Sequence, residues 1–310
     1  MALKLAKTTG YFRDGFVPFA DMQLSVASAS VLYGLGVYTV FRASWDSHND
    51  QLWAFRLEDH YKRLCQSARI MDFADFSLAY SFSQFKHLML DLLKTNKVKE
   101  DVLVRVSWFV DEQLAGTKSR GLACSMAAFI YPASPLYDAN GIHVGISSYI
   151  RTPDNAIPAR AKVHGNYVNA ALAKNEALAG GYQEAIMLDQ FGQVAESTVT
   201  NVCVVREGII YSPSPSTDLL EGITVRTVEV LADSLNIPFV WRAIDRSELA
   251  IADEIFITGS SAGVTPVISV NKQPIGRGVV GPITGKLATA YADARLGRMR
   301  DSHHWVTATY

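Results

Sequence analysis

Along the chain, stretches whose hydrophobic residues have helical spacing alternate with stretches whose composition is typical of strands. Apolar residues three to four positions apart, as at Leu57, Tyr61, Leu64, Ala68 and Met71, predict an amphipathic helix. This spacing and helix-forming composition predict helices over residues 57–71, 81–96, 166–181, 222–237 and 283–299. Stretches rich in β-branched and aromatic residues predict strands over 31–45, 51–55, 101–110, 121–131, 142–150, 184–189, 193–198, 201–206, 209–213, 239–244 and 252–260. With a hairpin expected around Asp14-Gly15, the fold class is mixed α/β (α+β).

One loop-forming stretch interrupts these patterns near the middle of the chain. It contains Pro132, Pro135, Asn140 and Gly141, which are typical of turns and connections. A chain of 310 residues is also long enough for two domains. We therefore expect an N-terminal domain over 1–132, an interdomain loop over 133–141 and a strand-rich C-terminal domain over 142–310.

Composition and charge narrow the class of protein. Hydrophobic residues make up 49% and charged residues 19%, which is ordinary for a globular chain. The formal net charge is −1, so the basic surplus that serves nucleic-acid binding is absent. No apolar run reaches the ~18 residues of a membrane span, and the first residues lack the apolar core of a signal peptide. The three cysteines, Cys65, Cys124 and Cys203, are widely spaced, which indicates buried thiols and a cytoplasmic location.

Two motif-like stretches and the histidines carry little weight. Gly259–Gly263 reads GSSAG, the pattern of a hydrolase nucleophile elbow around Ser261, but the following VTPVISV does not predict the required helix. Gly281–Lys286 is one residue short of a phosphate-binding P-loop and is followed by Leu287 instead of Ser or Thr. The seven histidines show no metal-ligand spacing, so no metal site is predicted.

One lysine, one acid and two turns form a more informative set. Lys162 lies in a loop before a predicted helix, and a lysine amine becomes nucleophilic when desolvated or placed near another cation. Glu196 lies on a predicted strand among small and hydroxyl residues. The turn Gly222-Ile223-Thr224 begins a predicted helix, with Thr224 as its expected cap, and the GSSAG turn offers further N–H groups; both suit a phosphate. Together they suggest pyridoxal phosphate, which needs a Schiff-base lysine, a partner for the pyridine nitrogen and a phosphate site.

Long stretches of the chain resemble the class IV pyridoxal-phosphate aminotransferases, and most of all the branched-chain amino acid aminotransferases. The resemblance is most specific over 157–189, IPARAKVHGNYVNAALAKNEALAGGYQEAIMLD, and continues through GQVAESTVTNVCVVREGIIYSP, LLEGITVRT and FITGSSAGVTPV. The N-terminal stretches SASVLYGLGVYTVFR and FRLEDHYKRLCQSARIM, and the late HHWVT, agree as well. It implies the two-domain fold of this class (PLP fold type IV), with a smaller N-terminal α/β domain, a larger strand-rich C-terminal domain, and a homodimer or higher homo-oligomer completing each site.

The resemblance also assigns roles to single residues. It implies that Lys162 holds the cofactor and acts in catalysis. It also implies that Tyr167 forms a hydrogen bond with the phenolic oxygen of the cofactor and that Glu196 faces the cofactor's pyridine nitrogen. The positions that match phosphate-binding or cofactor-binding residues are Arg56, Gly222, Ile223, Thr224, Gly259 and Ser260. The positions that match substrate-binding residues are Tyr33, Tyr38, Arg105, Ser260 and Ser261. Arg105 is the expected partner of a second substrate carboxylate.

The substrate-binding motifs depart from the branched-chain pattern at two places. This chain has Tyr38-Thr39-Val40 where Phe-Glu-Gly is usual, and Ser260-Ser261-Ala262-Gly263 where Thr-Ala-Ala-Glu is usual. The expected reaction is ping-pong transamination from a branched-chain L-amino acid to 2-oxoglutarate. A D-amino-acid transaminase, an (R)-amine transaminase and an aminodeoxychorismate lyase stay open as alternatives within the class. A serine hydrolase and a non-catalytic binding module stay open outside it.

Overall fold

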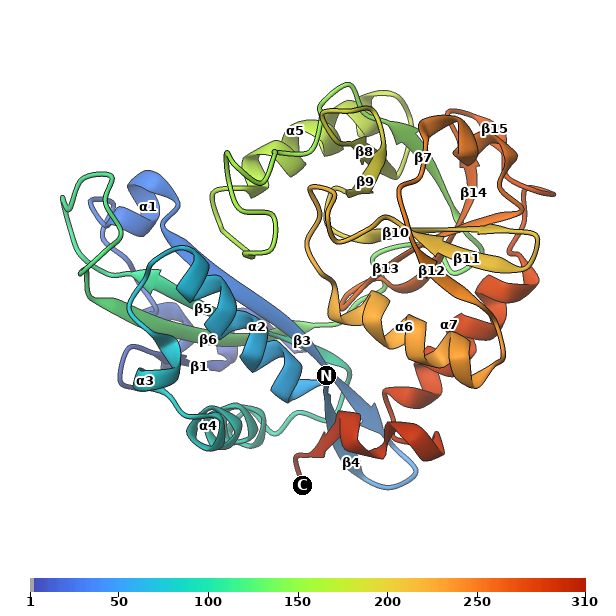
Figure 1. Ribbon diagram of the computed structural model, residues 1–310. Coiled ribbons are helices and arrows are strands. Elements are labelled where there is room, and N and C mark those ends of the chain that lie inside the picture. The colour runs from blue at the N-terminus through green and yellow to red at the C-terminus, as the bar shows by residue number, and fades with distance from the viewer. Residues whose placement is uncertain (1–2) are drawn as a thin grey trace. The chain divides into compact units, whose positions relative to one another are not determined.

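The computed structural model describes residues 3–310, which form two compact units (Figure 1). The first comprises the chain up to Ser134, the segment Ala161–Gly165 and the segment Ala294–Tyr310. The second comprises Pro135–Arg160 and Asn166–Asp293. The boundary after Ser134 lies within the expected loop 133–141. The expected C-terminal domain, 142–310, includes residues 161–165 and 294–310, which the contacts group with the first unit. With those segments counted in the first unit, the two units are similar in length.

The first unit is a seven-stranded antiparallel sheet within the described residues, covered on one face by helices. Its elements are η1 (Leu5–Lys7), β1 (Thr9–Phe12), β2 (Gly15–Pro18), η2 (Phe19–Asp21), α1 (Ala29–Tyr33), β3 (Gly36–Asp46), β4 (Gln51–Phe55), α2 (Leu57–Ile70), α3 (Phe76–Ala79), α4 (Phe82–Thr95), β5 (Val102–Val110), β6 (Cys124–Pro132), η4 (Arg300–Trp305) and β16 (Val306–Ala308). The strand order is β16-β4-β3-β5-β6-β1-β2. The expected hairpin at Asp14-Gly15 is confirmed as β1 and β2.

Alternation along β3, β5 and β6 gives this sheet a core face and a second face. Phe41, Val104, Val106, Ala128 and Ile130 are fully buried on the core face, which packs against α2 and α4 (Figure 1). Residues that are directly paired point to the same side of a sheet, so the register defines the other face as well. Tyr38 pairs with Ser107, and Val40 pairs with Arg105, which places these four side chains together on the second face.

The second unit is built on a nine-stranded mixed sheet within the described residues. Its elements are β7 (Ile142–Ile146), α5 (Tyr167–Ala179), β8 (Glu184–Leu188), β9 (Val194–Ser197), β10 (Asn201–Arg206), β11 (Ile209–Ser212), α6 (Ile223–Ser234), β12 (Phe239–Trp241), η3 (Arg246–Ile251), β13 (Glu254–Gly259), β14 (Gly263–Val270), β15 (Gln273–Pro274) and α7 (Pro282–Ala294). The strand order is β12-β11-β10-β13-β14-β7-β8-β9, and β15 pairs with β14. Valine and isoleucine side chains such as Val144, Ile186, Val202 and Ile257 fill its core.

The structure corrects two local predictions, at residues 31–33 and at Thr224, and shows which element follows the GSSAG motif. Residues 31–33 were expected in a strand, but they end the short helix α1, because Gly34 takes the left-handed conformation (φ 67°) that terminates it. Thr224 was expected to cap α6, but the cap is Gly222, and Thr224 lies inside the helix. The stretch after GSSAG is the strand β14, so the elbow motif around Ser261 lacks its helix. In residues 3–310 no helix has the length and apolar character needed to cross a bilayer.

Candidate active site

Lys162 lies on a short segment, Ala161–Gly165, that is fastened to the edge of β3; this segment is called the strap below. Val163 bridges to Val37, the backbone N–H of His164 donates to the oxygen of Gly36 over 2.8 Å, and the N–H of Tyr38 donates to the oxygen of Lys162 over 3.0 Å. The sequence predicted a loop here. These backbone hydrogen bonds pair the loop with β3 in the way that a neighbouring strand would pair, so the backbone of Lys162 has a defined position.

The Lys162 amine lies beside the aromatic ring of Tyr38. Its Nζ is 5.1 Å from the ring centroid, and the guanidinium carbon of Arg105 lies 3.6 Å from the same centroid. Both distances are within the range of cation–π attraction. The structure therefore brings three predicted residues, Lys162, Tyr38 and Arg105, together on the second face of the first sheet.

A buried histidine lies on the opposite side of β3. His60 of α2 pairs its Nδ1 with the Oγ1 of Thr39 over 2.7 Å, and both residues are fully or almost fully buried. Burial, followed by the charges of Arg63, Arg56 and Lys162, holds the pKa of His60 well below its ordinary value. The imidazole is therefore neutral at pH 7, and Thr39, one of the departures from the family pattern, is its hydrogen-bond partner.

Arg56 and Tyr33 each lie at an end of a helix in the first unit. Arg56 is the N-cap residue of α2 with a positive φ of 53°, forms an ion pair with Asp59 over 2.6 Å and lies 4.9 Å above the ring of Trp305. Tyr33 ends α1 with 44% of its surface exposed. Both side chains belong to the first unit, and for Tyr33 no described contact joins it to Lys162.

Glu196 is the centre of a buried cluster in the second unit. Its Oε1 accepts from Nε of Arg151 over 2.5 Å, while its Oε2 accepts from Nδ2 of Asn201 and from the N–H of Leu220, each over 3.3 Å. Glu196 and Arg151 are 6% and 8% exposed. An ionised carboxylate has about four acceptor positions, so three bonds leave room for one further donor.

Two glycines bring backbone turns against this cluster. A Cβ at Gly222 would lie 1.9 Å from Oδ1 of Asn201, and a Cβ at Gly259 would lie 2.9 Å from the methyl carbon of Thr200. Thr200 and Asn201 follow Glu196 by four and five residues, so the start of α6 and the turn after β13 are both packed beside the Glu196 turn. Both positions need glycine for close approach rather than for an unusual φ.

These two turns and the start of α5 contain the remaining predicted residues of the second unit. Within residues 3–310 no side chain caps the start of α6, where the N–H groups of Ile223 and Thr224 begin the helix. Gly259 ends β13, and Ser260 and Ser261 form the turn into β14. Tyr167 opens α5, next to the buried Asn166, whose Oδ1 has no hydrogen-bond partner among the described residues.

Three residues of these clusters were missed by the sequence reasoning: Arg151, Asn201 and His164. The sequence signal for Arg151 was weak, because an arginine at the end of a predicted strand is usually exposed. Asn201 could have been suspected from its position in a stretch that resembles the family, AESTVTN. His164 is two residues from Lys162, and its ring lies 5.2 Å from the ring of Tyr38.

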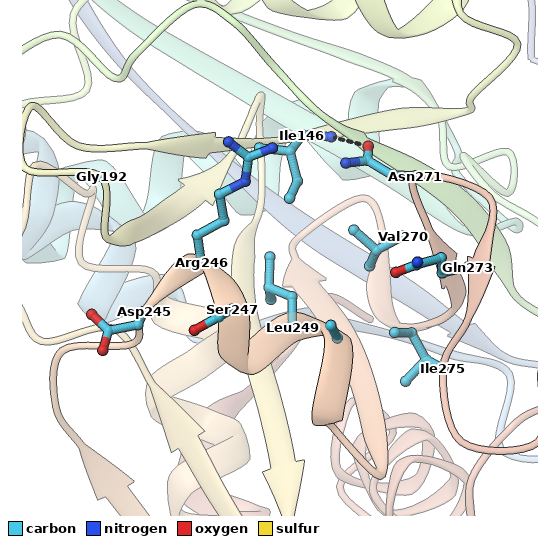
Figure 2. A pocket seen from close by; sticks show the side chains of 11 residues that line it. Ile146, Gly192, Asp245, Arg246, Ser247, Leu249, Val270, Asn271, Gln273 and Ile275 are labelled. Atoms are coloured by element: carbon cyan, nitrogen blue, oxygen red, sulfur yellow. Dashed lines mark hydrogen bonds between the residues drawn. The ribbon is translucent and has the colours of Figure 1, made fainter.

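The second unit also has a cavity of about 550 Å³ whose lining residues are not those of the Glu196 cluster. Figure 2 shows it between Ile146, Arg246, Leu249, Asn271 and Gln273, and none of the predicted site residues lines it. The described part of the chain also contains no group of three or more His, Cys, Asp or Glu side chains arranged for a metal ion. The predicted chemistry is thus concentrated on the strap and around Glu196.

Comparison with known proteins gives one consistent result. The family model "Amino-transferase class IV" matches residues 36–270. A branched-chain-amino-acid aminotransferase of Pseudomonas aeruginosa is 35% identical over 299 residues, covering 95% of each chain. The structure is similar to that of a branched-chain aminotransferase from Thermoproteus uzoniensis with norvaline, with a TM-score of 0.93 and 33% identity over 98% of this chain and 99% of that one.

A branched-chain amino acid aminotransferase from the organism abbreviated T.th. is similar too, at 31% identity and a TM-score of 0.91, with 99% of this chain and 100% of that chain covered. That protein has been crystallised with 4-methylvaleric acid and with N-(5'-phosphopyridoxyl)-L-glutamate.

Proposed function

Because this chain belongs to the class IV aminotransferases, we propose that it is a pyridoxal-phosphate-dependent transaminase that moves the amino group of a branched-chain L-amino acid to 2-oxoglutarate. The observation that carries the proposal is the position of Lys162, whose backbone is fixed to β3 and whose amine lies beside Tyr38 and near the cation Arg105. A lysine amine held at a fixed position can act as a nucleophile toward the aldehyde of the cofactor once it is deprotonated.

The residues of the second unit fit the requirements of pyridoxal phosphate. Glu196 has one acceptor position left for the pyridine N–H, after its bonds to Arg151, Asn201 and Leu220. The first N–H groups of α6, at Ile223 and Thr224, and the turn at Gly259–Ser260 provide donors for the phosphate. We assign Arg56 as a further phosphate partner and Tyr167 as the partner of the phenolic oxygen.

In this proposal the residues divide the work of proton transfer. When bound, pyridoxal phosphate takes up the electron pair that remains after a proton leaves the substrate's α-carbon. With the cofactor bound, the Lys162 amine would accept that proton and would deliver a proton to the cofactor carbon that keeps the amino group. Such positioned proton transfer is worth roughly 10²–10⁴-fold in rate. The negative charge of Glu196 keeps a proton on the pyridine nitrogen, and Arg151 compensates that charge within the protein.

The second face of the first sheet provides the proposed substrate pocket. The ring of Tyr38 offers apolar surface for a branched side chain, and the half-buried Arg105 offers charge for the second carboxylate of 2-oxoglutarate. The T.th. relative, with its 4-methylvaleric acid and phosphopyridoxyl-glutamate complexes, combines the same two ligand types. Tyr33 is assigned to the same pocket, and Ser260 and Ser261 of the second unit stay assigned as substrate-binding residues.

Assembly and location follow as parts of the proposal. We infer a homodimer, since Val31, Leu32 and Tyr33 of α1 are 53%, 47% and 44% exposed and form an apolar surface. Sedimentation equilibrium measures this directly. We infer a cytoplasmic location from the three unpaired thiols, which suit a reducing compartment.

The test uses the cofactor-loaded protein and its absorbance. We expect L-leucine, L-valine or L-isoleucine to convert the cofactor to its amino form, and 2-oxoglutarate to convert it back. Lys162→Ala should lose this reaction, whereas the exposed Lys118→Ala should keep it. Turnover of D-amino acids or (R)-amines instead, or pyruvate release from aminodeoxychorismate, would transfer the proposal to one of the alternatives within the class. A protein that binds no pyridoxal phosphate would end it.

A further inference from the structure

Arg105 is a partly exposed cation that forms no ion pair with a carboxylate of residues 3–310. In the part of the chain that the structure describes, its guanidinium stacks 3.6 Å from the centroid of Tyr38 and makes no ion pair. An arginine that is partly removed from water and lacks an acidic neighbour is a binding group for an anion. The proposed function assigns that anion as the second carboxylate of the acceptor.

His164 packs closely against the face of the first sheet that carries Arg105. Its ring lies over Gly36, where any Cβ would approach its Nδ1 to 2.6 Å, so the glycine is required by the histidine. The Nε2 atom is 3.3 Å from the hydroxyl of Ser107, which pairs across the sheet with Tyr38. His164 therefore shares one face with Tyr38, Ser107 and Arg105.

The imidazole is neutral in the absence of an anion. Burial, and then the positive charge of Arg105, lower its pKa to about 4. The ring of Tyr38 from β3 lies 5.2 Å from it, and Arg105 from β5 and Lys162 from the strap both lie over that same ring. A carboxylate bound to Arg105 would offset the positive charge of Arg105 and would attract the protonated imidazole, so both effects would raise the pKa of His164.

We propose that His164 determines acceptor specificity: together with Arg105 it binds the second carboxylate of a dicarboxylic substrate, and in mildly acidic solution it takes up a proton from water as that carboxylate binds. With an apolar side chain in the same place, the imidazole stays neutral and its flat ring adds to the surface of Tyr38. One pocket can then hold an apolar and an acidic side chain in turn. This inference depends on the proposed function, because it assigns a role in the same substrate pocket.

Two unreactive acids test the inference on the cofactor-loaded protein. Glutarate carries the second carboxylate and 4-methylvalerate carries an apolar end, so the ratio of their dissociation constants isolates the second carboxylate. Both constants are measured by titration calorimetry at pH 8.0 and pH 6.0, in at least two buffers with different ionisation enthalpies. If a bound carboxylate returns the imidazole pKa to the ordinary ~6.5, the affinity for glutarate should rise about fourfold from pH 8.0 to pH 6.0, relative to 4-methylvalerate.

The variants separate charge from shape. His164→Asn keeps a polar group near Ser107 but cannot take a proton, so the relative fourfold rise and the buffer-dependent heat should disappear; His164→Gln serves if the first variant does not fold. The exposed His87→Asn is the matched control and should behave as wild type. An equal rise in wild type and His164→Asn would overturn the inference. Failure of the proposed function is a different result, since wild type would then not react with L-leucine.

Discussion

The Nε of Arg151 lies 2.5 Å from Oε1 of Glu196, and both side chains are buried. Removing one partner of such a pair leaves an uncompensated charge inside the protein, at a cost of about 3–5 kcal/mol. We therefore expect Arg151→Met to lower the free energy of unfolding by about that amount in urea titrations. The control, Arg160→Met, removes an exposed pair with Glu221 and should cost about 0–1 kcal/mol.

A double variant checks the cause of that loss. In Arg151→Met with Glu196→Gln no charge is left unpaired, so we expect a large part of the stability to return. If the double variant is no more stable than Arg151→Met alone, the loss does not come from the unpaired carboxylate.

Two histidines whose pKa values are lowered in the folded protein, His60 and His164, make stability dependent on pH. The folded-state pKa values of His60 and His164 lie below the unfolded value of ~6.5, so the unfolded chain binds more protons in acid and stability falls as pH drops below about 6.5. For His164, with a folded pKa of about 4, the loss at pH 5 relative to pH 8 is about 2 kcal/mol. Urea titrations of wild type and His164→Asn from pH 8 to pH 5 measure this. A variant with the same acid loss as wild type would contradict the assignment.

Gly222 should not tolerate a side chain. Alanine there would place its Cβ 1.9 Å from Oδ1 of Asn201, so Asn201 must move and its bond to Glu196 is lost. We expect Gly222→Ala to weaken pyridoxal-phosphate binding by tenfold or more, about 1.4 kcal/mol, measured by fluorescence titration of the apoprotein. Gly15→Ala, where a Cβ meets nothing within 4 Å, should bind as wild type. Unchanged affinity in Gly222→Ala would mean that the cofactor does not use this cluster.

Thr39 stabilises the fold through its hydrogen bond to the buried His60. Thr39→Val removes the hydroxyl that bonds Nδ1 of His60, and a buried nitrogen without a partner costs about 1–3 kcal/mol. Thermal and urea unfolding should show this loss. The exposed Thr289→Val on α7 should stay within about 0.5 kcal/mol of wild type. A neutral result at Thr39 would imply that another group satisfies the histidine.

The periodic parts of the chain were predictable because burial acts on every turn or every second residue. The helices α2, α4, α5, α6 and α7 and most strands of the second unit coincide with the patterns of the sequence. Residues 31–33 were mistaken for a strand, because their β-branched and aromatic composition is outweighed by the left-handed Gly34 that ends α1. Thr224 was mistaken for a cap, because a glycine at Gly222 was needed for packing against Asn201.

The chemistry of the site was predictable only in part. Lys162 and Glu196 could be selected from their surroundings in the sequence, since each is a chemical group in an unusual local context. Arg151 and His164 could not, because their roles depend on partners 45 and 57 residues away, Glu196 and Ser107. Tertiary pairs of this kind leave no periodic trace in a single chain.

The last strand of the first sheet comes from the far end of the sequence. β16 pairs with β4, and Trp305 accepts from the backbone of Arg56 and packs against its guanidinium. During synthesis on a ribosome, one edge of β4 therefore stays without a paired strand until the second unit has been made. Only then are η4 and β16 available to cover that edge. A fragment ending at Ser134 would keep this edge exposed and would lack the strap with its lysine, so it is expected to self-associate rather than to behave as an independent module.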